Sequence, residues 1–299
     1  MIRSLIVLAT LAVVVLAAAP VVAQSEMRNP RAVGMGEAYA GGGNASGAIF
    51  HNPAGIITAG VYEGLAGWQL AGATDSNAIG VSIVDSKTNP NVAAAAAWSY
   101  VFANGDGDTR ADDARDHHFR GALAFPVVPQ RLSLGLGARY TSVRTGWSLG
   151  SDGTESGGEA QRAKPFTFDA GLMASVNRNL VVGASFQNIL QPDDAIEGRR
   201  YNAGIGVYLD ALHVELAYAG EQSLTGSQTG HGVRAGAEYT LGPVPIRLGF
   251  SRNGLSEQNY VHGGLGYRSR TVGLDVALQQ NVSGVPDDRL ILISISGYM

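Results

Sequence analysis

The stretch Leu132-Ser133-Leu134-Gly135-Leu136-Gly137-Ala138-Arg139-Tyr140-Thr141 alternates apolar residues with polar or small ones. Alternation with a period of two places successive side chains on opposite faces of a β-strand, so this stretch predicts a strand with one apolar face. The same division recurs in 166–176, 201–209, 212–218, 233–240, 244–251, 261–268 and 272–279. The chain is therefore predicted to be all-β over most of its length.

The connections between these strands alternate between short and long. Short turns are predicted at 87–90, 127–130, 177–179, 209–211, 242–245 and 268–270. Longer polar segments lie at 104–117, 149–164, 190–199, 220–230, 252–259 and 281–288. Outer-membrane β-barrels have short periplasmic turns and longer extracellular loops, so this strict alternation favours a membrane barrel.

A soluble sandwich would also show alternation, but with its apolar face inward. The aromatic residues separate the two architectures, because membrane barrels carry aromatic girdles on either side of an aliphatic band. On the apolar faces, Phe166, Phe186, Tyr201, Tyr218 and Phe250 are predicted near the extracellular ends, and Tyr239 and Tyr267 near the periplasmic ends. This distribution favours the membrane barrel.

The polar faces are then predicted to line the lumen, because an Arg that faces lipid at the bilayer midplane costs about 2–4 kcal/mol. These faces carry Arg139, Asp169, His213, Glu215, Arg234, Glu238, Arg247, His262, Arg268 and Asp275. Arg139 with Asp169, and Arg234 with Glu238, Glu215 and Arg247, lie on neighbouring strands, and we expect these groups to pair with each other or to hold residues 24–60. Two interpretations stay open for these charges: structural pairing, and a ring that selects solutes.

The pattern gives about fourteen strands, an even number that returns both ends of an antiparallel barrel to the periplasm. They are predicted near 61–70, 76–86, 91–102, 118–127, 131–148, 164–177, 179–190, 200–209, 211–220, 230–241, 244–253, 259–268, 271–281 and 289–299. The fold class is thus a transmembrane, antiparallel outer-membrane β-barrel over 61–299.

The first 23 residues have the features of a secretory signal peptide: an early Arg3, an apolar stretch and a small-residue cleavage site at Val21-Val22-Ala23. No later segment approaches the ~20 apolar residues of a membrane-spanning helix. The chain has no cysteine, and its net charge of −4 argues against a nucleic-acid partner. We expect export to the outer membrane of a Gram-negative bacterium, in contact with its lipid.

Residues 24–60 show no strand period and are rich in small residues. The segment contains Gly34, Met35 and Gly36, and later Asn52, Pro53, Ala54 and Gly55. Asn52-Pro53 forms turns readily, and Gly55 can adopt a positive φ. We interpret 24–60 as a compact turn-and-helix element that packs against other backbone.

The opening R-x-x-G-M-G-x-A-Y followed by N-P-A-G resembles the FadL superfamily of outer-membrane proteins, and the PorV/PorQ-like group most closely. The segments 168–172, 179–188, 236–239 and 274–277 are also similar to that group. The resemblance implies a fourteen-stranded barrel whose N-terminal segment is folded inside as a hatch. In the fatty-acid transporters of this superfamily, the hatch blocks a passive route for hydrophobic substrates.

Two functions follow from the resemblance. One is hatch-gated passive transport of small or hydrophobic molecules. The alternative is a scaffold or shuttle barrel that binds proteins of a secretion or cell-surface machinery, as the PorV-like relatives do. A third class, a lipid hydrolase, would need a Ser/His pair that the sequence does not assemble, so we expect no enzyme and no catalytic residue.

Three local motifs have structural explanations that compete with chemical ones. Gly146-Trp147-Ser148-Leu149-Gly150 matches G-x-S-x-G but precedes a polar loop rather than a helix. The carboxylates from 104 to 118 begin like a calcium loop but lack its sixth-position Gly and twelfth-position Glu, which leaves a solvated loop or a weak cation site. The pairs Gly135/Gly137, Gly204/Gly206 and Gly264/Gly266 are interpreted as lumen glycines that accommodate the hatch. No metal site and no cofactor is expected.

Overall fold

The computed structural model describes residues 26–72, 76–103, 115–145, 148–149, 155–156, 161–193, 195–224, 226–283 and 288–299. The signal peptide predicted at 1–23 lies outside the described residues, as does most of the 104–118 loop and of the 146–150 motif.

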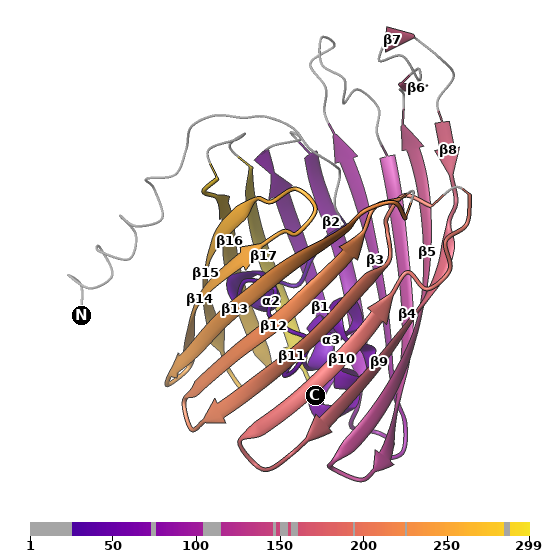
Figure 1. Ribbon diagram of the computed structural model, residues 1–299. Coiled ribbons are helices and arrows are strands. Elements are labelled where there is room, and N and C mark those ends of the chain that lie inside the picture. The colour runs from indigo at the N-terminus through magenta and orange to yellow at the C-terminus, as the bar shows by residue number, and fades with distance from the viewer. Residues whose placement is uncertain are drawn as a thin grey trace, which may run out of the picture.

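Fourteen antiparallel strands of the described chain form a closed barrel, as predicted (Figure 1). The first five are β1 (Tyr62–Ala71), β2 (Ser76–Asp85), β3 (Ala93–Ala103), β4 (Arg115–Val128) and β5 (Leu132–Thr145). The other nine are β9 (Phe166–Ser175), β10 (Leu180–Gln187), β11 (Arg200–Leu209), β12 (Leu212–Gln222), β13 (Thr229–Leu241), β14 (Val244–Arg252), β15 (Asn259–Arg268), β16 (Val272–Asn281) and β17 (Arg289–Tyr298). Consecutive strands of this series pair with each other, and β1 pairs with β17 to close the barrel.

Three further strands are short, and only one of them joins the barrel wall. β8 (Gln161–Ala163) continues the pairing of β5 beyond the start of β9, while β6 (Ser148–Leu149) and β7 (Glu155–Ser156) pair with each other. They lie at one end of the barrel, which we call the long-loop end; the opposite, short-turn end carries the tight connections (Figure 1).

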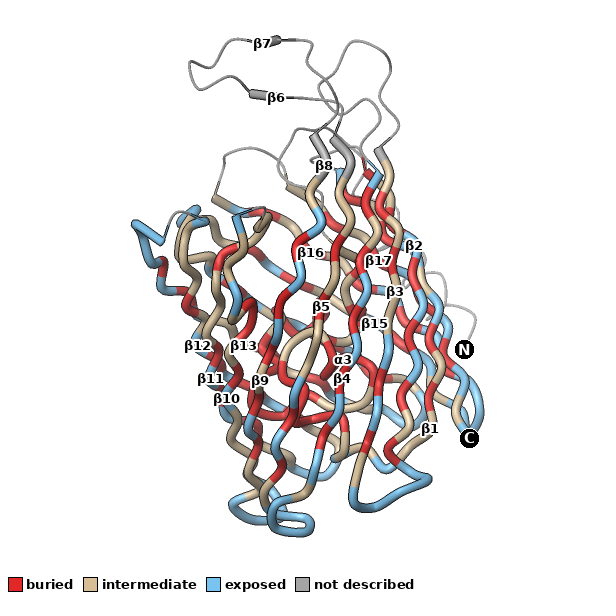
Figure 2. The backbone as a smooth tube through the Cα atoms, turned by 90° about the vertical axis from the view of Figure 1, so that its right-hand side faces the viewer, coloured by how far each residue is buried: buried red, intermediate tan, exposed pale blue. Residues whose placement is uncertain are grey.

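The direction of the side chains agrees with the alternation in the sequence. Arg247 is 1% exposed, whereas its neighbour Leu248 is 69% exposed. The register pairs Glu238 with Arg247, so both of these charged residues share the inner face. Buried and exposed positions alternate along the other strands in the same way (Figure 2). The outer surface is therefore apolar and the inner surface polar.

The exposed aromatic residues lie near the two ends of this surface. Phe166 begins β9 and Phe250 lies near the end of β14, both toward the long loops. Tyr239 and Tyr267 lie near the short-turn ends of β13 and β15. Aliphatic side chains such as Leu248 occupy the middle, which is the arrangement that two membrane interfaces favour.

Residues 26–60, which we call the N-terminal segment, lie inside the barrel (Figures 1 and 2). The segment contains α2 (Pro30–Gly34), α3 (Ala45–His51) and the 3₁₀-helix η1 (Pro53–Thr58). Asn29 caps α2 by accepting hydrogen bonds from the backbone N–H groups of Arg31 and Ala32. Helix α2 contacts β14 to β17, while η1 contacts β3, β4, β5 and β9 on the opposite side of the lumen. No helix of the described residues is long and apolar enough to cross a membrane.

Candidate functional site: the barrel interior

The first half of the motif in the N-terminal segment packs backbone against backbone. Gly36 has φ +65, and a Cβ atom added to it would come 2.6 Å from the carbonyl oxygen of Phe250. A Cβ at Gly249 would come 2.1 Å from the nitrogen of Gly36, and one at Gly236 would come 2.2 Å from the oxygen of Met35. Only glycine fits these three positions, so Met35-Gly36 sits directly on β13 and β14.

The second half of the motif is attached through Asn52, whose side chain is fully buried. Its amide nitrogen donates to the carbonyl oxygens of Ala40 at 2.8 Å and Leu172 at 3.1 Å. Its amide oxygen accepts a hydrogen bond from the backbone N–H of Ala54 at 3.1 Å. One side chain thus joins two parts of the N-terminal segment to strand β9.

The lumen glycines predicted from the G-x-G pairs mostly face the N-terminal segment. A Cβ at Gly135 would come 2.2 Å from the Ala54 nitrogen and 2.3 Å from the carbonyl carbon of Pro53. Three further glycines face the segment at longer distances: a Cβ would come 2.8 Å from Gly41 at Gly204, 3.1 Å from Gly42 at Gly206, and 3.2 Å from Gly34 at Gly264. In contrast, Gly137 and Gly266 face the barrel carboxylates of Asp169 and Asp275. Gly55 packs within the segment, against the Gly43 oxygen.

A chain of charges links α2 to the wall. Arg31 donates to both carboxylate oxygens of Glu238, at 2.8 and 2.9 Å. Glu238 also pairs with Arg247 at 2.6 Å, and Arg247 pairs with Asp275 at 2.6 Å. Asp275 in turn pairs with Arg268 at 2.9 Å. The network is mostly buried, so each charge depends on its neighbour for compensation.

Glu215 and Arg234 contact the N-terminal segment. Glu215 accepts hydrogen bonds from the backbone N–H groups of Gly41 at 2.7 Å and Gly42 at 2.9 Å. Arg234 lies 4.0 Å from Glu37 and does not pair with Glu238, Glu215 or Arg247. Arg234 therefore contacts the N-terminal segment, the second of the two roles expected for it, rather than its strand neighbours. Four residues along a strand separate it from Glu238 by about 13 Å.

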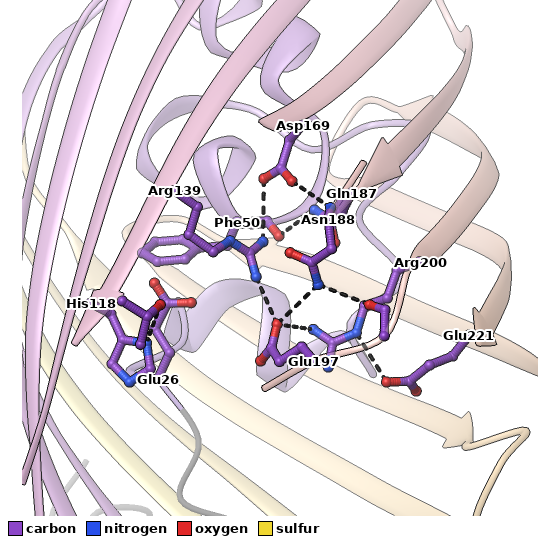
Figure 3. Close-up of polar contacts among 12 residues, drawn as sticks. Glu26, Phe50, His118, Arg139, Asp169, Gln187, Asn188, Glu197, Arg200 and Glu221 are labelled. Atoms are coloured by element: carbon purple, nitrogen blue, oxygen red, sulfur yellow. Dashed lines mark hydrogen bonds and ion pairs between the residues drawn. The ribbon is translucent and has the colours of Figure 1, made fainter. Parts of the chain in front are cut away.

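A second cluster of charges lies near the long-loop end (Figure 3). Arg139 pairs with Asp169 at 3.2 Å, as predicted, and with Glu197 at 2.7 Å. Glu197 also lies 3.5 Å from Arg200. Asp169 accepts a further hydrogen bond from the backbone N–H of Asn188 at 2.9 Å. The connection after β10 therefore folds inward and supplies charge to the lumen.

Arg120 connects this cluster to the N-terminal segment. Its Nε donates to Glu26 at 2.6 Å and its Nη2 bonds the other carboxylate oxygen of Glu26, a bidentate arrangement. The guanidinium also lies 5.1 Å from the centre of the Phe50 ring. The sequence pattern did not point to Glu26, Glu37, Arg120 or Glu197. Arg120 could have been found, since it shares its strand face with the buried Ala122 and Ala124.

Two cavities lie on either side of the N-terminal segment. The long-loop cavity, of about 200 Å³, is lined by residues that include Arg28, Glu37, Arg120, Glu197 and Arg234. The short-turn cavity, of about 490 Å³, is lined by another set that includes Arg31, Glu63, Arg268 and Tyr298. The segment therefore lies between the two cavities.

No protein-family model and no curated protein matches the chain. Solved structures do match it. The Ralstonia pickettii toluene transporter TbuX superposes with a TM-score of 0.63 at 14% identity, over 90% of this chain and 97% of that one. A Pseudomonas aeruginosa FadL homologue gives 0.61 at 12% identity, over 92% and 98%. The P. putida toluene transporter TodX gives 0.59 at 12% identity, over 89% and 96%.

This chain shares their fold. At these identities the likeness shows the fold alone, which in this chain is a closed antiparallel barrel of fourteen strands.

Proposed function

We propose that this protein is an outer-membrane barrel that carries small or hydrophobic molecules passively across the membrane, with residues 24–60 as its hatch. The proposal includes export by a cleaved signal peptide at 1–23 and no catalytic step. Its apolar outer surface suits acyl chains, and its fold is shared with two toluene transporters.

The single observation that carries the gating proposal is the fit of the N-terminal segment to the lumen glycines. Backbone contacts at Gly135, Gly236 and Gly249 leave no room for a side chain between segment and wall. A solute can therefore cross the barrel only after the N-terminal segment has been displaced.

Substitution of a wall glycine by a larger residue tests this proposal without removal of any part of the segment. Gly249→Val forces a side chain into the backbone of Gly36, whereas Gly263→Val on the adjacent β15 places one where no atom lies within 4 Å. We expect higher single-channel conductance in planar bilayers for Gly249→Val and unchanged conductance for Gly263→Val. Deletion of 24–55 should raise conductance further; an unchanged value in that variant would refute the hatch.

The alternative, a PorV/PorQ-like scaffold or shuttle barrel, is favoured by the extent to which the segment fills the lumen. The long-loop cavity is small, and eight residues of α2 and η1 are buried: Pro30, Ala32, Val33, Gly34, Pro53, Ala54, Gly55 and Ile56. A scaffold needs no open route. Chemical crosslinking in cells followed by purification should then recover one consistent secretion or surface protein, and a barrel recovered alone would argue against this role.

A further inference from the structure

Ten of the residues that line the long-loop cavity are charged, which is unexpected for a route used by hydrocarbons. Five arginines face it: Arg28, Arg120, Arg200, Arg234 and Arg252. Five carboxylates face it as well: Glu26, Glu37, Glu197, Glu221 and Asp288. The formal charges balance, so any preference of the cavity for anions or cations depends on which groups are already paired.

The carboxylates are engaged by other groups. Glu26 pairs with Arg120, and Glu197 and Glu221 both pair with Arg200. Asp288 accepts a hydrogen bond from the hydroxyl of Tyr260 at 3.1 Å. These four carboxylates therefore have donors of their own.

The arginines around Glu37 are not matched in this way. Arg28 pairs with Glu37 at 2.8 Å, and Arg234 lies 4.0 Å from the other oxygen of the same carboxylate. Two guanidinium groups thus share one carboxylate. Among the described residues, the Arg234 side chain makes no hydrogen bond, although only 22% of it is exposed. A largely buried cation with five N–H donors and so distant a partner favours an added anion.

The titration of Glu37 agrees with this excess of positive charge. Burial opposes ionisation of the carboxyl group, but the charges of Arg28 and Arg234 outweigh it and hold the pKa of Glu37 well below its ordinary value. Glu37 is therefore a fixed anion. Among Glu37, Arg28 and Arg234, the group without a close partner is the guanidinium of Arg234.

The bonding of Arg120 shows how this wall holds a carboxylate. Glu26 reaches Arg120 from the N-terminal segment and is held by two parallel N–H···O bonds in a site where Arg120 is 8% exposed. Planar guanidinium groups recognise carboxylates in this manner. Arg234 lines the same cavity, but its one carboxylate partner lies 4.0 Å away and forms no such bidentate pair.

We propose that the long-loop cavity binds a small hydrophilic carboxylate between Arg234 and Arg28. The volume of about 200 Å³ far exceeds the roughly 10–15 Å³ that one water needs, and it admits a short organic acid. Ser251, beside Arg234 in the β13–β14 ladder, also lines the cavity, and its hydroxyl lies 2.8 Å from Nε2 of His262. The inference that small carboxylates are transported rests on the proposed transport function. The inference that the cavity binds them does not.

Calorimetric titration of the detergent-solubilised full chain with sodium succinate tests the site. We expect saturable binding to the native chain and at least tenfold weaker binding to Arg234→Gln. Arg234→Lys keeps the charge without the fork and should lie between them. Arg178→Gln, in the exposed turn after β9, changes net charge equally and should bind like the native chain. Glu37→Gln removes the competing carboxylate and should bind succinate more tightly.

Unchanged succinate binding in Arg234→Gln, with the heat-dependent gel shift of an intact barrel retained, would overturn the proposal. So would equal competition by chloride, which would mark general electrostatic attraction, or binding of toluene in preference to succinate.

Uptake of labelled succinate by proteoliposomes separates the two proposals. Binding without uptake would refute transport and leave the anion site standing, whereas uptake that Arg234→Gln does not alter would refute the site alone.

Discussion

Arg31 in α2 forms two hydrogen bonds with the carboxylate of Glu238 in β13, at 2.8 and 2.9 Å, across 207 positions of the chain. Glu238 is held at the same time by Arg247 at 2.6 Å. The carboxylate therefore keeps a cationic partner when Arg31 is lost, whereas the segment loses its bidentate bond to the wall. This asymmetry allows the segment to be loosened without disruption of the barrel.

Arg31→Met should accordingly release the N-terminal segment and leave the barrel folded. Loss of hydrogen bonds to a largely buried charged group costs about 1.5–3 kcal/mol, which would raise the fraction of detached segments by about 10- to 150-fold. Limited chymotrypsin digestion at the buried Tyr39 measures this detachment. Arg178→Met is the control and should leave the digestion rate unchanged. Equal rates in both variants would show that the bond to Glu238 does not hold the segment.

Asn52→Ala should detach the segment from β9. The substitution leaves the carbonyls of Ala40 and Leu172 and the N–H of Ala54 without a side-chain partner. A buried group that loses its hydrogen bond costs about 1–3 kcal/mol. Hydrogen exchange of the η1 amides should accelerate. Asn89→Ala, which removes a similar bond to the exposed N–H of Asn91, should leave η1 protected; slow exchange in both variants would contradict the assignment.

Leu248→Arg tests the membrane placement of the outer surface. Leu248 lies at the middle of β14 and is 69% exposed, while Leu241 is 62% exposed at the short-turn end of β13. An Arg costs about 2–4 kcal/mol at the bilayer midplane and about 0–1 kcal/mol near the interface. Urea unfolding in lipid vesicles should therefore show a clear loss of stability for Leu248→Arg and little for Leu241→Arg. Equal losses would place the membrane elsewhere.

The barrel could be predicted from the sequence because strand period is fixed by backbone geometry. Fourteen strands were expected, and β11 and β15 begin and end at the predicted residues. The inward direction of Arg139, Asp169 and Arg247 followed from the same alternation. Each of these inferences needed only local pattern and the cost of charge in lipid.

The contacts of the interior could not be predicted in the same way. Glu26, Glu37 and Glu197 belong to segments without strand period, so their positions depend on how the chain folds across the lumen. Two roles were expected for Arg234, and only the structure shows that it contacts Glu37 of the segment rather than Glu238, because residues that share a strand face can still be far apart along it. The G-x-G glycines of the strands were informative, because their spacing indicated where the backbone of the N-terminal segment approaches the barrel wall.

The packing of the segment should weaken in mild acid through His51, a partly buried residue of α3. Burial lowers the pKa of its imidazole to about 3, and its ring packs edge-on against Tyr39 with a distance of 5.6 Å between centroids. The nearby charges are mixed: Glu37 favours protonation, while Arg28, Arg120 and Arg234 oppose it.

In a detached segment the same imidazole has its ordinary pKa of about 6.5. Below that pH the imidazole is protonated in the detached state but stays neutral in the packed state. The free energy that favours packing therefore falls by at most about 1.4 kcal/mol per pH unit below pH 6.5, and it does not depend on this group's protonation above that pH. Chymotrypsin digestion at Tyr39 should accelerate from pH 7 to pH 5, a range in which carboxyl groups of ordinary pKa stay ionised. His51→Phe keeps a ring against Tyr39 and removes the titration, so its digestion should vary only with the protease's own pH profile. An acid response that persists in His51→Phe would assign it to another group.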